Sequence, residues 1–153
     1  MTDAEHPYCV ATVIREVHPE QIEDVVALHS FEEVVAYLRH TYDWFADVIA
    51  DYRAAEDFSP TDVPVGGFGV QLRNRWGGEV EVGVGRAVWF LFQREPRPSR
   101  CVSDRPALDG SLVFYLNGWH YTELKRDNLV SRSKCLSVLR EWLETGPLSA
   151  EDA

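Results

Sequence analysis

The stretch Ser111–Pro147 reads SLVFYLNGWHYTELKRDNLVSRSKCLSVLREWLETGP, and the order of its parts decides the fold. An aromatic-rich run over Ser111–Leu116 predicts a strand. It ends at Asn117-Gly118, a dipeptide that favours a tight hairpin turn because both residues tolerate positive φ. A second strand is expected over Trp119–Lys125, so the first half of the stretch predicts a β-hairpin.

The second half of the stretch predicts an amphipathic helix that begins near Ser131. Gly146 at the C-cap and Pro147 just after it should end the helix. Its apolar residues recur at helical spacing and should form one buried stripe. They are Cys135, Val138, Leu139, Trp142 and Leu143.

Three further strands are expected upstream, over Phe68–Asn74, Glu79–Gly85 and Ala87–Gln93. Tight turns at Gly77-Gly78 and Gly85-Arg86 would join them. The segment 94–110 is a connection rich in proline and arginine, with room for a short edge strand.

The predicted strands differ in their polarity pattern. Glu79–Val84 alternates charged and apolar residues at its start, which predicts one wet and one buried face. Ala87–Phe92 and Leu112–Leu116 do not alternate, which is typical of central strands covered on both faces. Either the long loops or a partner chain would have to cover the second face.

The N-terminal half predicts one strand and one long helix. The strand covers Tyr8–Val17 and is closed by His18-Pro19. The helix begins at a capping box formed by Ser30 and Glu33 and runs to about Arg53, before a loop at 54–67. Its apolar stripe steps by four and three residues. The stripe contains Phe31, Val35, Leu38, Tyr42, Phe45, Ile49 and Tyr52.

Together these elements predict an α+β fold. We expect a mostly antiparallel, meander-like β-sheet, with one long N-terminal helix and one C-terminal helix packed on it. At 153 residues the chain fits a single domain over 1–153. Its tail, 148–153, should fray.

The net charge of −10 is unevenly distributed. Residues 1–65 hold 14 Asp and Glu against 3 Lys and Arg, a net of −11, whereas residues 66–153 hold 11 against 12, a net of +1. An acidic field attracts basic partners and repels nucleic acid and anionic membranes, although it also simply promotes solubility.

Other features narrow the class of protein. No run approaches 18 apolar residues, and the acidic N-terminus lacks a secretory signal pattern. The three cysteines, Cys9, Cys101 and Cys135, are far apart, which favours a reducing cytoplasm over a disulfide scaffold. No metal-ligand spacing such as Cys-x-x-Cys occurs. We therefore expect a cytoplasmic protein without a metal or other cofactor.

The chain resembles the Imm-one family of immunity proteins from bacterial polymorphic toxin systems, mainly over residues 68–147. The shared parts are a glycine-punctuated strand pair at Val82–Phe92, the hairpin at Asn117-Gly118 with the strand Trp119–Leu124, and a helix that closes on Glu144–Pro147. The resemblance implies a non-enzymatic protein that binds a cognate toxin, often a nucleic-acid deaminase, and blocks its active site. It implies no catalytic residues.

The candidate partner-binding residues lie opposite the apolar stripe of the long helix. Asp43, Asp47 and Asp51 are like charges four residues apart, each pair of which destabilises an isolated helix by about 0.2–0.5 kcal/mol. Trp44 lies beside them and predicts a binding hot spot. The whole set is Glu33, His40, Asp43, Trp44, Asp47 and Asp51. The alternative is a solvated face with Trp44 packed under the 54–67 loop.

Other reactive residue types have structural explanations. His120 and Glu123 are three apart on a strand and should point to opposite faces. Ser131 and Ser133 fit a helix start, and Cys135 fits the core. The glycine runs at 66–67 and 83–85 lack the lysine and the strand-loop-helix setting of a phosphate loop.

Two hypotheses follow. The first is an immunity protein that binds a basic toxin domain by steric occlusion, without direct contact with nucleic acid or membrane and with its oligomeric state left open. The second is a small-ligand-binding or enzymatic cone-shaped α+β domain, with a pocket between the long helix and a curved sheet. Convergent polar groups within the concavity would favour the second hypothesis. A packed core with an acidic, aromatic outer surface would favour the first.

Overall fold

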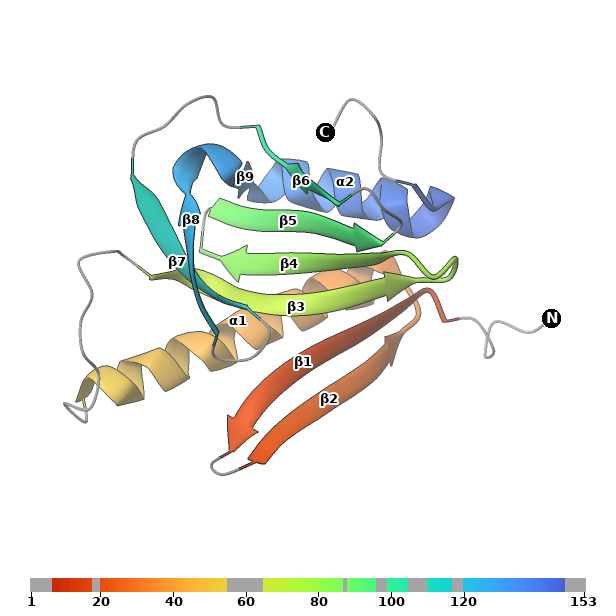
Figure 1. Ribbon diagram of the computed structural model, residues 1–153. Coiled ribbons are helices and arrows are strands. Elements are labelled where there is room, and N and C mark those ends of the chain that lie inside the picture. Colours follow the sequence, from red (N-terminus) through yellow and green to blue (C-terminus); the bar gives the residue numbers. More distant parts are fainter. Residues whose placement is uncertain are drawn as a thin grey trace.

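The computed structural model describes residues 7–17, 20–54, 65–86, 88–95, 99–104, 110–116 and 120–147 (Figure 1). The element order is β1 Cys9–Val17, β2 Glu20–Leu28, α1 Phe31–Ala54, β3 Val65–Asn74, β4 Glu79–Gly85, β5 Val88–Glu95, β6 Arg100–Val102, β7 Ser111–Leu116, β8 His120–Lys125, a 3₁₀ turn Arg126–Asn128, β9 Val130–Ser131 and α2 Arg132–Thr145.

The sheet is mostly antiparallel, with the order β2-β1-β3-β4-β5-β6. This confirms the α+β class. Two features differ from the prediction. The chain forms strand β2 where no element was expected, so α1 follows two strands. In addition, β7 pairs in parallel with β3, which a meander does not do.

One edge of β3 is shared between two strands. Residues 71–74 of β3 pair with Cys9–Thr12 of β1, whereas Val65, Gly67 and Phe68 pair with β7. Beyond Thr12, β1 no longer has a partner in β3, although β1 and β2 stay paired along all nine residues. The far half of the β1–β2 hairpin therefore leaves the body of the sheet, as Figure 1 shows.

Both helices pack on one face of the sheet (Figure 1). The predicted stripe of α2 is confirmed, since all five of its apolar residues are buried. The stripe of α1 is rotated relative to the prediction. Its buried residues are Val34, Leu38, Thr41 and Phe45. Phe31, Val35 and Tyr42 are only half-buried, and the side chains of Ile49 and Tyr52 lie outside the described part.

The prediction of a wet face on β4 is wrong. Every residue of β4 after Glu79 is buried, and even Glu81 is only 5% exposed. Strand β7 crosses this second face (Figure 1). It also covers β5, for which the long loops or a partner chain had been the expected cover, because Phe90 of β5 packs with Leu112 and Phe114 of β7. A second apolar cluster fills the layer between them. It is formed by Phe90, Leu112, Phe114 and Leu129.

Glycine allows this close approach of β7. A Cβ atom at Gly66 or Gly83 would lie 2.6 Å from the ring of Phe114, a distance that side chains do not tolerate. Gly66 and Gly83, which belong to the two glycine runs noted in the sequence, therefore make room for an aromatic ring.

The helix boundaries follow their predicted caps. The Ser30 hydroxyl accepts the N–H of Glu33 at 3.2 Å, and the Glu33 carboxylate accepts the N–H of His29. Ser131 caps α2 by accepting the N–H of Lys134 at 3.3 Å. Gly146 ends α2 with a φ of 108°, a conformation that favours glycine.

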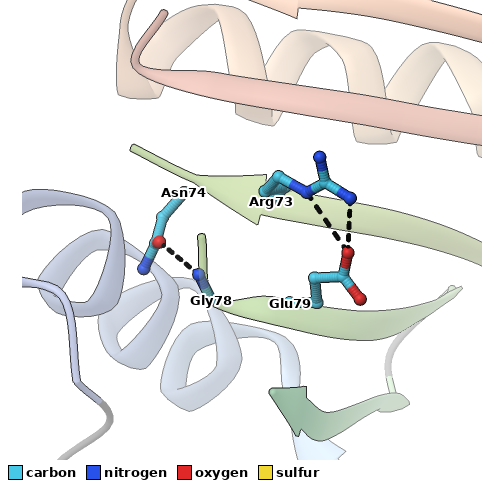
Figure 2. A network of polar contacts seen from close by, with 4 residues as sticks. All are labelled: Arg73, Asn74, Gly78 and Glu79. Carbon is cyan, nitrogen blue, oxygen red and sulfur yellow. Dashed lines mark hydrogen bonds and ion pairs between the residues drawn. The ribbon is translucent and has the colours of Figure 1, made fainter. Parts of the chain in front are cut away.

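Asn74 joins the β3–β4 turn to the end of α2. Its Oδ1 accepts the N–H of Gly78 at 2.9 Å, which Figure 2 shows beside the Arg73–Glu79 pair that spans the same two strands. Its Nδ2 donates to the carbonyl of Trp142 at 3.3 Å and to that of Gly146 at 3.0 Å. Because Asn74 is only 4% exposed, these bonds fix the position of α2 on the sheet.

Candidate binding site beside helix α1

A groove of about 560 Å³ runs between α1 and the β1–β2 hairpin. It opens where β1 separates from β3, so it follows directly from the shared edge of β3. Its lining residues come from three elements. They are Val13 of β1, Glu23, Asp24, Val25 and Val26 of β2, and Tyr37, His40, Thr41 and Trp44 of α1.

Trp44 forms part of the wall of this groove and is not the solvent-facing residue that the sequence predicted. It is half-buried, and its ring meets that of Phe68 edge-on with centroids 5.4 Å apart. The rotation of the α1 stripe explains the difference, because it turns Trp44 toward β3. Trp44 therefore has a structural role in addition to any role in binding.

The polar groups of the groove are mainly acidic. Glu23 is exposed and Asp24 is half-buried, while His40 is exposed on the facing helix. The Thr41 hydroxyl donates to the carbonyl of Tyr37 at 2.9 Å and so is satisfied within the helix. The groove thus combines an apolar, aromatic wall with carboxylates at its rim.

The β2 side of the groove was not predicted from the sequence, because no strand was expected there. A signal was available, since the β-branched residues Ile22, Val25 and Val26 follow the turn dipeptide His18-Pro19, whose own structure lies outside the described residues. Among the described residues, β2 pairs only with β1, and Val25 is 62% exposed.

The structure describes the side chains of two of the three predicted aspartates of α1. Asp43 and Asp47 are exposed on the outer surface of α1, one turn apart and next to the groove residues His40 and Trp44. Glu33 is used in the helix cap. The side chain of Asp51 lies outside the described part.

Trp76, in the β3–β4 turn, is a large aromatic residue that was not among the predicted binding residues. It is 54% exposed, and the guanidinium of Arg75 lies 5.4 Å from its ring centroid. Nothing in the sequence pattern separates this tryptophan from the buried ones, because turn residues carry no periodicity.

The described cysteines are poor nucleophiles at neutral pH. Burial raises the pKa of the Cys9 thiol to about 12 and that of Cys101 to about 11. Burial also raises the pKa of Cys135, which is fully enclosed in the core. Ser131 is the α2 cap, and the side chain of His120 lies outside the described part.

Comparison with protein-family models, curated proteins and solved structures finds no match for this chain. The described residues contain no group of three or more His, Cys, Asp or Glu that could hold a metal ion. In the same part of the chain, no helix is long and apolar enough to cross a membrane.

Proposed function

We propose that this chain is an immunity protein that captures a basic toxin domain through the groove beside α1 and the adjoining carboxylates. The observation that carries the proposal is a groove that combines Glu23 and Asp24 with an apolar, aromatic wall. Asp43 and Asp47 are exposed on the adjoining surface of α1. Such a surface fits the usual anatomy of a protein interface, in which an aromatic centre is surrounded by a polar rim.

The mechanism is occlusion of the toxin's active site by a surface that mimics nucleic acid. The carboxylates stand in for phosphates and speed the encounter with Lys and Arg of the toxin. Tyr37 and Trp44 then supply apolar contact area, which governs how long the complex persists. The toxin in this scheme acts on nucleic acid, with deaminases as the first class to test.

One edge of β2 has no partner strand among the described residues, which favours a protein partner over a small ligand. A partner strand can add to this edge through its main chain while its basic side chains reach the groove. Self-association through β2 is disfavoured, because an antiparallel pair of β2 strands would bring Glu23 and Asp24 of the two copies together.

The direct test is to look for a gene encoding a basic toxin domain next to the gene for this chain, and to co-express the two proteins. We expect the chain to restore growth and to form a complex that survives size-exclusion chromatography. The double substitution Asp43→Asn/Asp47→Asn should weaken rescue. Toxicity unchanged by the wild-type chain, with both proteins folded and expressed, would refute the proposal for that toxin.

The second candidate, a small-ligand-binding domain, is supported by the size of the groove, which falls within the usual range of ligand sites. The space between α1 and the sheet is itself filled by Leu38, Phe45 and Phe68, each at most 3% exposed. A ligand would therefore occupy the groove at the side of α1. Thermal-shift screening against wild-type and Trp44→Leu protein separates this candidate from the first, because a groove ligand raises the Tm of the wild type without a partner protein and should raise that of Trp44→Leu less.

A further inference from the structure

A second, smaller hollow lies on the other flank of α1 and has the opposite charge. Its volume is about 100 Å³. Three arginines line it from three separate elements: Arg39 of α1, Arg86 in the β4–β5 connection, and Arg132 at the start of α2. The remaining lining residues are Val35, Tyr42, Val84, Gly85 and Trp89.

The three arginines have no counter-charge within the hollow. Elsewhere on the surface, Arg73 pairs with Glu79 and Arg140 with Glu144. Within the described part of the chain, the side chains of Arg39, Arg86 and Arg132 make no ion pair or hydrogen bond, and no carboxylate lines the hollow. The hollow therefore gathers three guanidinium groups without a carboxylate, in a chain of net charge −10.

A buried donor in the wall also lacks an acceptor. Trp89 is only 4% exposed, and its indole Nε1 has no hydrogen-bond partner among the described residues. Buried polar groups are nearly always satisfied, so an unpaired N–H on a residue that lines the hollow is compatible with an acceptor bound there. Arg132 is the first residue of α2, whose N-terminal end adds positive potential.

We infer that this hollow binds an oxyanion with the chemistry of phosphate. The planar fork of a guanidinium group matches two oxygens of a phosphate, so that two parallel hydrogen bonds form. The volume accommodates one phosphate group but not a nucleobase. The source is either free inorganic phosphate or the terminal phosphate of a small ester whose remainder lies outside the hollow. The inference does not depend on the proposed function, because it uses the opposite flank of α1.

The test is titration of the full chain with inorganic phosphate in a phosphate-free buffer of low ionic strength. Binding is followed by calorimetry and by the ¹H–¹⁵N signals of the tryptophan indoles, with the Trp89→Phe variant used to assign the signal of Trp89. We expect saturable binding to one site and a shift of the Trp89 indole signal. Phenyl phosphate serves as the ester, and tighter binding of it than of phosphate would identify an ester as the source.

The variants Arg39→Gln, Arg86→Gln and Arg132→Gln should each weaken binding about tenfold, as expected for loss of a charge-assisted hydrogen bond. All three residues are exposed, so the variants should fold, which circular dichroism checks. Arg94→Gln is the matched control, because it removes an equal charge from an exposed residue of β5 outside the hollow. The affinity of Arg94→Gln for phosphate should stay within about twofold of that of the wild type, since a distant surface charge is largely screened.

Two results would overturn the inference. The first is the absence of saturable binding for both phosphate and phenyl phosphate. The second is that Arg94→Gln weakens phosphate binding as much as the three hollow variants do. The effect would then come from the net charge of the chain and not from a specific site.

Discussion

The two hollows beside α1 have opposite charges although they flank one helix. The groove that faces the β1–β2 hairpin is lined by Glu23 and Asp24 of β2, and Asp43 and Asp47 are exposed on the outer surface of the helix. The flank that faces α2 has Arg39 and a small hollow with Arg86 and Arg132. The net charge of −10 is therefore a sum over segregated surfaces and describes neither of them.

The kind of partner that a surface binds should therefore be inferred from the residues on that surface and not from the net charge of the chain. Both flanks depend on one inner face of α1, whose Leu38 and Phe45 pack on the sheet. Changes to that face should affect both flanks together, whereas changes to surface charges should affect one flank alone.

The largest expected effect comes from Phe45→Ala. Phe45 is 3% exposed and its ring lies 5.4 Å from that of Phe68 and 6.1 Å from that of Tyr115, centroid to centroid. Emptying such a site should lower the free energy of unfolding by about 3–5 kcal/mol. Urea denaturation measures this loss. Asp43→Ala, on the exposed side of the same helix, should change it by at most about 0.5 kcal/mol. A loss below 1 kcal/mol for Phe45→Ala would mean that α1 is not anchored as described.

A smaller effect distinguishes the two tryptophans. Trp44→Ala removes a half-buried ring that contacts Phe68, so the free energy of unfolding should fall by about 1–2 kcal/mol. Trp76→Ala, at a 54% exposed turn position, should cost less than about 1 kcal/mol. If Trp76→Ala lowers the free energy of unfolding more than Trp44→Ala does, then Trp44 is exposed to solvent and the groove has no aromatic wall.

The smallest effect concerns the acidic flank in the absence of a partner. Asp43→Asn/Asp47→Asn removes a like-charge pair four residues apart, so the free energy of unfolding at low salt should rise by about 0.2–0.5 kcal/mol. The gain should vanish in high salt because the repulsion is screened. A loss of stability would show that these carboxylates serve the fold, and would remove the reason to assign them to a partner.

The sequence predicted those parts of the molecule that local signals determine. The caps and the stripe of α2 all lie between Ser131 and Gly146, and the structure confirms them. The prediction of a solvent-exposed face on β4 was wrong because the residue that covers this face, Phe114 of β7, lies more than thirty positions further along the chain. A local sequence pattern does not reveal such a contact. The rotation of α1 had a similar cause, since tyrosines at 37 and 42 and Trp44 surround the true stripe with competing apolar area.

The candidate site was less predictable than the fold. His40, Asp43, Trp44 and Asp47 were found from one helix, but the groove beside them requires β2 and the parallel pairing of β3 with β7. The arginine hollow joins residues 39, 86 and 132, which only the tertiary structure brings together.

The most direct test of the proposed function uses a toxin domain that this chain is found to neutralise. Its rate constant for association with this chain is measured by stopped flow at low and high salt. Asp43→Asn/Asp47→Asn should slow association about tenfold at low salt and flatten its salt dependence. Glu141→Gln/Glu144→Gln removes the same charge from exposed residues of α2 and should leave the rate within about twofold. Equal association rates for the Asn variant and the wild type at low salt would contradict the account, because the acidic flank would then have no part in capturing the partner.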